Sequence, residues 1–290
     1  MQLKQYFRER RILVNHALHR YFPKKDKYSQ TLWKAMHYSV FNDGKRLRPI
    51  LVIAAYEAVN KKSNASKNQV LLAASCALEF IHTSSLILDD LPCMDNSDIR
   101  RDKPSNHIVF GEGPALLAAD ALLTYAFEVL AGNVPPQYSI PLTSVLAEAV
   151  GPQGMIGGQV IDIKYRGKRA SYKTLHYIHT HKTGALFVAA AIVGATLANA
   201  SPKQIKALVD YSSHIGLAYQ ITDDILDVVK APHHPRIVHP EVNFASTLGI
   251  EKAKKTVVEL VEAAIDSIAN LNHNADPMRE IAKYVGKRTK

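Results

Sequence analysis

The stretch that decides the fold is residues 79–107, EFIHTSSLILDDLPCMDNSDIRRDKPSNH. An apolar run typical of a buried helix ends here in three carboxylates, Asp89, Asp90 and Asp95. Like charges a few ångströms apart repel strongly in a low dielectric, so a cluster inside the fold needs cations beside it. Oxygen ligands without a thiolate partner favour magnesium over zinc. An acidic loop in solvent is the alternative reading of this cluster taken alone.

The spacing of the three carboxylates does not suit a regular helix. Six positions separate Asp95 from Asp89, and a turn of about 100° per residue would place them on different faces. Pro92 is expected to end or distort the helix and so to let Asp95 fold back. Arg100 and Arg101 follow, and arginine forks beside magnesium-binding carboxylates suit a diphosphate.

Composition limits the classes of protein. The 290 residues suffice for a large core, and 47% hydrophobic with 21% charged residues is ordinary for a globular chain. The net charge of +10 favours anionic partners. Because basic and acidic residues are interspersed and aromatic-rich basic tracts are missing, we expect anionic small substrates and no nucleic acid.

Cysteines and apolar runs bear on the compartment. Cys76 and Cys93 offer neither a disulfide framework nor a thiolate metal site, which favours a reducing cytoplasm. Residues 1–15 lack the apolar stretch of a secretory signal peptide. The longest largely apolar run, 185–198, is too short to cross a bilayer, so no membrane span is expected.

Apolar residues three and four positions apart recur along the chain and predict helices. The predicted helical segments are 30–41, 48–60, 69–90, 114–131, 139–150, 172–181, 184–198, 202–229 and 248–270. Glycine and proline clusters separate them, and neither a sustained period-two pattern nor a fixed repeat is visible. We therefore expect an all-α fold, a single domain over 1–290 built as a bundle of about ten helices around a central cavity.

A basic stretch precedes one of the predicted helices at residues 42–49, NDGKRLRP. Cations at the start of a helix oppose its macrodipole, which predicts an anion there. Lys45 and Arg48, three positions apart, can grip one diphosphate together. A solvated beginning of the helix is the alternative.

Histidines occur in two places. His82 shares a helix face with Glu79, about two turns before the acidic cluster, and is either a core histidine or part of a binding site. Three more lie close together: His176, His179 and His181. A zinc site is not expected there, because no carboxylate or thiolate is at hand to complete tetrahedral coordination. Lys182 and Thr183 then begin the most apolar helix, where a cation is expected only if it faces an anion.

Residues 151–159, GPQGMIGGQ, are glycine-rich. A dinucleotide-binding fingerprint requires a preceding strand, which the sequence does not predict. The glycines are expected instead to let helices approach closely beside the cavity, with Gln159 and Asp162 facing inward.

A second acidic cluster lies at residues 220–227, QITDDILD. Asp223 and Asp227 are four positions apart and share a helix face, about 6 Å from each other, with Asp224 beside them. Two aspartate clusters inside apolar helices predict a cavity with carboxylates on opposing walls and magnesium between them.

The order of GKRLRP, the first aspartate cluster, HKTGA and the second aspartate cluster makes the chain similar to trans-isoprenyl diphosphate synthases of the short-chain type. The resemblance covers residues 42–284 and implies a farnesyl or geranylgeranyl diphosphate synthase. Such an enzyme condenses isopentenyl diphosphate with dimethylallyl, geranyl or farnesyl diphosphate, through magnesium-assisted ionisation, attack by the double bond and loss of a proton. It also implies a homodimer.

The resemblance assigns roles to individual residues. Six aspartates are implied as the magnesium shell: Asp89, Asp90, Asp95, Asp223, Asp224 and Asp227. Four residues are implied to hold isopentenyl diphosphate: Lys45, Arg48, His82 and Arg101. Four more are implied around the allylic diphosphate: Arg100, Lys182, Thr183 and Gln220.

Product length is expected to be set just before Asp89, because a helical turn rises about 5.4 Å, close to one isoprene unit. Farnesyl-making bacterial relatives carry an aromatic residue five places before that aspartate. Here Ser84 and Ser85 are small, and with the insertion at 92–93 they favour geranylgeranyl over farnesyl diphosphate. Tyr125 or Phe127 on the next helix is the alternative floor of the cavity.

One segment departs from the family pattern, and two other classes of protein are the alternatives. Residues 228–241 read VVKAPHHPRIVHPE, with Glu241 where the family carries a lysine that touches the allylic diphosphate; Lys230 or Arg236 is the hypothesised substitute. A non-catalytic or weakly active subunit of a heteromeric prenyl synthase is supported only by this segment. A class I terpene cyclase is disfavoured, because it needs no second diphosphate site and its second metal motif mixes Asn, Ser and Glu.

Overall fold

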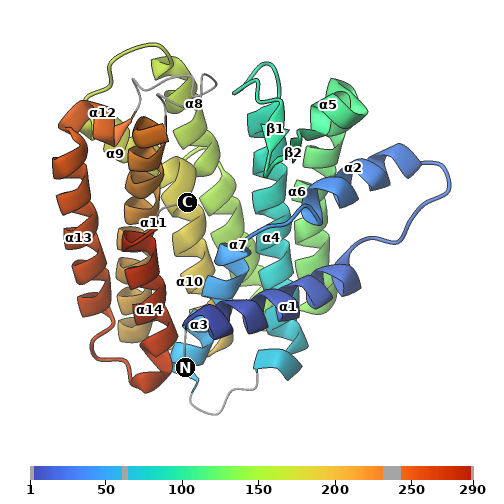
Figure 1. Cartoon of the computed structure of the whole chain (residues 1–290). Helices are drawn as coiled ribbons and strands as arrows, with labels where there is room; N and C mark the ends of the chain where they lie inside the picture. The colour runs from blue at the N-terminus through green and yellow to red at the C-terminus, as the bar shows by residue number, and fades with distance from the viewer. Residues whose placement is uncertain (1–2, 61–64, 231–242, 289–290) are drawn as a thin grey trace. The chain divides into compact units, whose positions relative to one another are not determined.

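The structure, a computed structural model, describes residues 3–60, 65–230 and 243–288, the side chain of Lys230 excepted, and is almost entirely helical (Figure 1). The α-helices are α1 (Leu3–Tyr21), α2 (Gln30–Val40), α3 (Leu47–Val59), α4 (Gln69–Asp90), α5 (Asn106–Phe110), α6 (Glu112–Asn133), α7 (Pro136–Val150), α8 (Met155–Tyr165), α9 (Tyr172–Ile178), α10 (Ala185–Leu197), α11 (Pro202–Lys230), α12 (Phe244–Leu248), α13 (Ile250–Ser267) and α14 (Asp276–Gly286). The other elements are the 3-10 helices η1 (Ala65–Lys67) and η4 (His273–Ala275), the π-helix η2 (His179–Gly184) and the strands β1 (Ile99–Arg100) and β2 (Lys103–Pro104). All nine predicted helical segments are helical, and the all-α class is confirmed.

The described residues fall into two compact units. One comprises residues 3–6, 51–60, 144–230 and 243–288, and the other comprises 7–50 and 65–143. The first aspartate cluster belongs to the second of these units, and the second cluster to the first. The expectations of one undivided domain and of one cavity with carboxylates on opposing walls therefore stay predictions.

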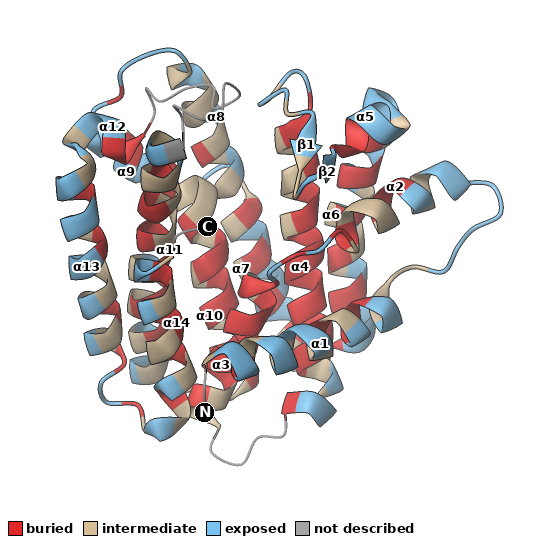
Figure 2. Ribbon diagram, viewed as in Figure 1, coloured by how far each residue is buried: buried red, intermediate tan, exposed pale blue. Residues whose placement is uncertain are grey.

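In the unit that holds the first aspartate cluster, α4 packs along α6 (Figure 1). Helix α4 begins at a regular cap, since the Asn68 side chain accepts a hydrogen bond from the Leu71 backbone N–H at 3.0 Å. Most of its residues are buried (Figure 2), which explains why its apolar run is continuous. The helix ends at Asp90, because Leu91 precedes Pro92 and is extended, with φ −59° and ψ 151°.

In the other unit, α11 packs against α10 and α13 and against the π-helix η2. Helix α10 is the most apolar helix predicted from the sequence and is largely buried (Figure 2). The short connection between α10 and α11 makes them antiparallel neighbours. This arrangement aligns the HKTG segment of η2 with the second aspartate cluster on α11.

Three helical stretches are long and apolar enough to cross a membrane, judged by length and composition alone. They are α4, α6 and the continuous helical run 172–197, and 78%, 39% and 61% of their most apolar windows lie buried inside the structure. They are longer than the run on which the sequence argument relied. The absence of a membrane span stays a prediction.

Candidate active site

The turn after α4 solves the spacing problem of the first cluster. The Asp95 backbone N–H donates to the Asp89 carbonyl at 2.8 Å, and the Met94 N–H donates to the Leu91 carbonyl at 2.8 Å. Asn96 completes the reversal with a φ of 49°. The prediction that Asp95 folds back on Asp89 once the helix ends is confirmed.

The middle aspartate of this cluster is held in place by an arginine. Asp90 is 2% exposed, and Arg100 donates from Nε at 3.0 Å and from Nη2 at 2.5 Å to its Oδ1. Burial raises the pKa of Asp90, and the hydrogen bonds and charge of Arg100 oppose that rise. Asp89 is half-buried and Asp95 is exposed, so these two retain accessible carboxylates.

A two-residue turn brings the next arginine to the basic stretch. Arg101 and Asp102 take φ values of 54° and 62° between the paired strands β1 and β2, as a tight hairpin turn requires. Arg101 Nη1 then donates to the Asn42 carbonyl at 2.7 Å. Gly44 lies beside this contact, because a Cβ at Gly44 would be 2.8 Å from Arg46 Nη1 and 2.9 Å from Arg101 Nη1. The glycine of the GKRLRP motif therefore makes room for two guanidinium groups.

Two side chains on one face of α4 hold two arginines of the basic stretch. Glu79 Oε1 accepts from Arg46 Nη1 at 2.8 Å, and both side chains are almost fully buried. One turn on, His82 Nε2 lies 3.0 Å from Arg48 Nη1. Since arginine only donates, Nε2 of His82 is the acceptor and the ring is the Nδ1–H tautomer. Lys45, directly before Arg46, is exposed.

His82 is neutral in this setting. Burial lowers its pKa well below the ordinary value, and positive charges lower it further, those of Arg48, Arg101, Arg100 and Arg46. The residue implied as a diphosphate ligand thus acts as an acceptor that orients Arg48, with Nδ1–H as its only donor.

We expect His82 to make the protein acid-sensitive. Below pH about 6.5 only the unfolded chain takes up this proton, so the free energy of unfolding falls by up to about 1.4 kcal/mol for each pH unit. His82→Gln keeps an acceptor for Arg48 and does not titrate, so the slope of this free energy against pH between about 5 and 6.5 should decrease by about one proton. Urea titrations at several pH values measure it. His16→Gln, on the exposed face of α1, is the control, and an unchanged slope in His82→Gln would contradict the assignment.

The three aspartates of the second cluster differ in exposure and in their hydrogen-bond partners. Asp223 Oδ1 accepts from Arg288 Nη2 at 2.5 Å, and the Arg288 guanidinium lies 4.2 Å from the centre of the Tyr219 ring. Asp224 is 4% exposed and accepts from His179 Nε2 at 2.9 Å. Asp227 is exposed. As in the first cluster, the first and last aspartates are accessible and the middle one is buried against a donor.

The HKTG segment is the last part of the π-helix η2, a distortion that occurs often at functional sites. Lys182 Nζ donates to Asp162 Oδ2 at 2.7 Å, and Thr183 Oγ1 donates to Gln220 Oε1 at 2.9 Å. Helix α8 approaches closely because a Cβ at Gly158 would lie 2.3 Å from the Lys182 backbone N. The predicted role of the glycines in close helix packing is confirmed for Gly158.

The proposed floor residues differ in their surroundings. Ser84 is 2% exposed, and Ser85 Oγ donates to the His82 carbonyl at 2.8 Å. Tyr125 donates to the Tyr21 carbonyl at 2.8 Å, and its ring centre lies 5.6 Å from that of Phe80. Phe127 is half-buried. Tyr125 therefore has a fixed position on α6, beside α4. The residues proposed to replace the missing lysine, Arg236 and the Lys230 side chain, and Glu241 itself, lie outside the described residues.

The polyprenyl synthetase family model matches residues 29–235 of the chain. The chain belongs to this family. A geranylgeranyl diphosphate synthase of Cyanophora paradoxa is 38% identical over 296 residues, which cover 99% of this chain and 96% of that protein. A farnesyl diphosphate synthase of Geobacillus stearothermophilus is 37% identical over 300 residues, 99% of this chain and 98% of that protein. The crystal structure of a FPP/GFPP synthase of Zymomonas mobilis has a TM-score of 0.87 and 34% identity and covers 98% of each chain.

These likenesses confirm the resemblance drawn from the motifs, the isoprenoid synthase type of fold and the class of enzyme, a short-chain trans-prenyltransferase. In the described part of this polyprenyl synthetase, no three His, Cys, Asp or Glu side chains converge closely enough to hold a metal ion. The aspartates of both clusters offer carboxylate oxygens, which is the ligand chemistry that suits magnesium.

Some residues of this polyprenyl synthetase site were not assigned from the sequence. The sequence suggests only a zinc-ligand role for His179, which is not expected, and nothing near Arg288 in the sequence marks it as a site residue. Asp162 was expected to face inward, and its ion pair with Lys182 agrees. The Gln159 side chain is also turned inward: both of its amide atoms are buried, and neither has a hydrogen-bond partner among the described residues.

Proposed function

We propose that this prenyltransferase condenses isopentenyl diphosphate with an allylic diphosphate in a magnesium-dependent reaction and releases geranylgeranyl diphosphate. The observation that carries the proposal is the turn at 91–97, which returns Asp95 to Asp89 beside the fork of Arg100 on Asp90. Accessible carboxylates next to anchored guanidinium groups match a diphosphate with its magnesium ions.

The proposed magnesium ligands are the accessible aspartates of the two clusters: Asp89, Asp95, Asp223 and Asp227. When bound, magnesium would supply Lewis-acid stabilisation of the departing diphosphate. The side chains of this chain do the remaining work. Arg48, oriented by His82, and the exposed Lys45 hold isopentenyl diphosphate together with Arg101. Arg100 and Lys182 bind the allylic diphosphate, each already held by a carboxylate.

Product length is proposed to be set at Ser84. The buried Ser84 offers little bulk one turn before Asp89, which supports growth to twenty carbons. Ser84→Phe should stop growth at fifteen carbons or fewer, because the ring fills the space of about one isoprene unit. Twenty-carbon product from this variant would move the floor to Tyr125 or Phe127.

The test uses the purified protein with magnesium, labelled isopentenyl diphosphate and each of dimethylallyl, geranyl and farnesyl diphosphate in turn, with products resolved by chain length. A twenty-carbon product from the wild type supports the proposal in full. A fifteen-carbon product keeps the reaction and corrects its end point. Absence of product from the chain alone, with activity restored by a second prenyl synthase chain, would favour the subunit alternative.

Arg288 competes with magnesium for Asp223. The Arg288 side chain is 7% exposed, so a metal ion at Asp223 must displace a well-held cation. We expect Arg288→Gln to lower about fivefold the magnesium concentration at which the protein is half-saturated. This change corresponds to about 1 kcal/mol, the contribution of a partly exposed ion pair. Calorimetric titration with magnesium measures the change. Lys287→Gln, the exposed neighbour, should leave the affinity unchanged, and an unchanged or weaker affinity in Arg288→Gln would refute the competition.

Helix α6 leaves Leu116 and Leu117 50% and 61% exposed, and α5, which packs on it, leaves Ile108 52% exposed. Apolar side chains exposed together on neighbouring helices support a homodimer, which sedimentation analysis would test against a monomer.

Two free cysteines, Cys76 buried and Cys93 exposed, support a reducing compartment, the cytoplasm.

A further inference from the structure

A hydrogen-bonded chain of four side chains runs from His179 to Thr183 within one unit. His179 Nε2 donates to Asp224 Oδ2 at 2.9 Å. Gln220 Nε2 donates to Asp224 Oδ1 at 3.1 Å, and Gln220 Oε1 accepts from Thr183 Oγ1 at 2.9 Å. The donor and acceptor of every link are fixed, because a carboxylate accepts from both sides and so determines which end of the Gln220 amide faces Thr183.

Helix geometry explains why these four residues meet. Gln220 and Asp224 are four apart on α11 and share one face. His179 and Thr183 are also four apart, on the π-helix η2, where a wider turn keeps them close to one face. The two helical segments approach closely one turn earlier on α11, since a Cβ at Gly216 would lie 3.0 Å from Gly184 Cα.

Both carboxylate oxygens of Asp224 already accept hydrogen bonds from within the protein. Its Oδ2 also accepts from the Phe244 backbone N–H at 2.7 Å, and its backbone carbonyl accepts from Asn243 Nδ2 at 3.0 Å. The residue is 4% exposed, as is His179, whereas the side chain of Asp223 is 29% exposed. The two neighbouring aspartates therefore have different environments and are suited to different roles.

We propose that Asp224 is a positioning residue and not a magnesium ligand, and that His179 holds its carboxylate so that Gln220 and Thr183 meet the allylic substrate in one orientation. The inference deepens the proposed function and rests on it for the identity of the substrate. While Asp224 holds the Gln220 amide in this orientation, the Thr183 hydroxyl donates its proton to Gln220 Oε1. The oxygen lone pairs of Thr183 can then accept from, or face, the substrate. A reversed Gln220 amide would make Thr183 an acceptor and turn its proton toward the substrate instead.

The test compares His179→Ala, His179→Gln and the control His176→Ala, which removes an exposed imidazole of the same segment. His179→Ala should lower kcat about 10- to 100-fold, the usual effect of losing a residue that orients a site, with the KM for isopentenyl diphosphate unchanged. His179→Gln should recover most of kcat, because its amide can donate to Asp224. His176→Ala should match the wild type. Equal losses in both His179 variants, in proportion to a reduced folded fraction, would show a role in folding only and overturn the proposal.

Metal affinity separates positioning from ligation without reference to turnover. Calorimetric titration with magnesium should show unchanged affinity for Asp224→Asn and His179→Ala and an affinity reduced about tenfold or more for Asp223→Asn. An equal reduction in Asp224→Asn would make Asp224 a ligand and overturn the proposal. If the wild type made no prenyl product, the proposed function would fail, while the titration and a protected Nε2 proton of His179 in the NMR spectrum would still decide the role of Asp224.

Discussion

Asp223→Asn is expected to lower kcat about 10³-fold with little loss of folded protein. The residue is the accessible first carboxylate of its cluster, and its charge is proposed to hold magnesium against the departing diphosphate. Loss of one such ligand removes several kcal/mol of transition-state stabilisation, and about 4 kcal/mol corresponds to this factor. Steady-state rates at saturating magnesium and both substrates measure the change.

The matched control is Asp210→Asn on the same helix, whose exposed carboxylate pairs only locally with Lys206 at 2.7 Å. It should keep wild-type kcat and wild-type magnesium dependence. Asp223→Asn also removes the charge that faces Arg288, so its thermal unfolding should be recorded beside its activity. More than a tenth of the wild-type kcat in folded Asp223→Asn would refute its role as a ligand.

Much of the fold could be predicted from periodicity, and the elements that were missed have physical reasons. Helices α4 and α10 are nearly continuous apolar runs, so their existence was clear. Helix α8 begins inside the glycine-rich segment, at Met155, because Gly158 serves close packing against η2 and not a turn. The terminal helices α1 and α14 were not predicted, although α14 carries the pattern of an amphipathic helix, with buried apolar residues three and four positions apart at Met278, Ile281 and Val285.

Most of the charged residues of the site could be predicted from the sequence, but their partners and their burial could not. The fold-back of Asp95 followed from Pro92, a local effect that sequence contains. Which aspartate of each cluster is buried did not follow, because Asp90 and Asp224 differ from their neighbours only in partners that lie far along the chain. Arg100 is 10 positions from Asp90, and His179 is 45 from Asp224. Arg288 lies 65 positions from Asp223, and only the packing of α14 brings it there.

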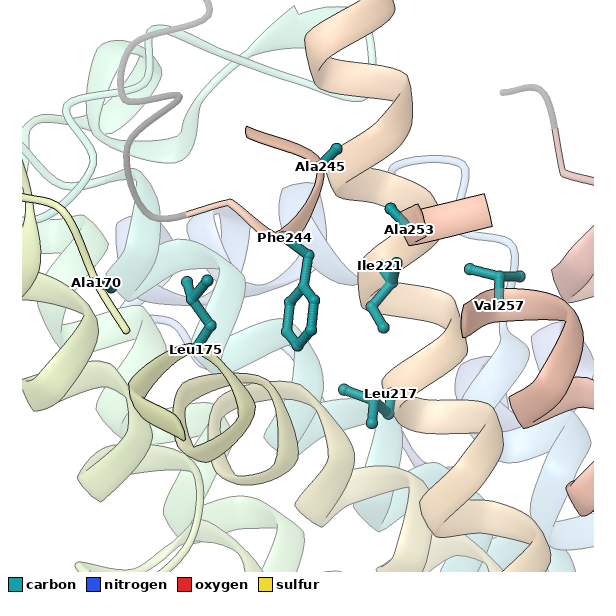
Figure 3. Packing of buried hydrophobic residues seen from close by; sticks show 8 residues of the cluster. All are labelled: Ala170, Leu175, Leu217, Ile221, Phe244, Ala245, Ala253 and Val257. Atoms are coloured by element: carbon teal, nitrogen blue, oxygen red, sulfur yellow. The ribbon is translucent and has the colours of Figure 1, made fainter. Parts of the chain in front are cut away.

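Phe244→Ala is expected to lower the free energy of unfolding by about 3–5 kcal/mol, the cost of a cavity in a packed core. The ring is fully buried and points between Leu175, Leu217 and Ile221 (Figure 3). These three residues come from α9 and α11, so one side chain links α12 to both helices. Since whole domains are stable by only about 5–15 kcal/mol, the variant should lose a large share of its stability. Denaturant unfolding with an unchanged slope would report this loss directly.

Two controls separate the cavity from the loss of an apolar group in general. Phe244→Leu keeps most of the volume and should cost less than about 1.5 kcal/mol, and Val258→Ala, 54% exposed on α13, should stay within about 0.5 kcal/mol. A loss below 1 kcal/mol in Phe244→Ala, within the usual range of a surface change, would mean that the cluster collapses onto the site. The centre of the Phe244 ring also lies 5.0 Å from that of the His179 ring, and the Phe244 backbone N–H donates to Asp224. The leucine variant keeps this backbone hydrogen bond to Asp224 while it alters the packing around His179. Activity retained in Phe244→Leu at reduced stability would therefore show that the backbone contact, and not the ring, orients Asp224.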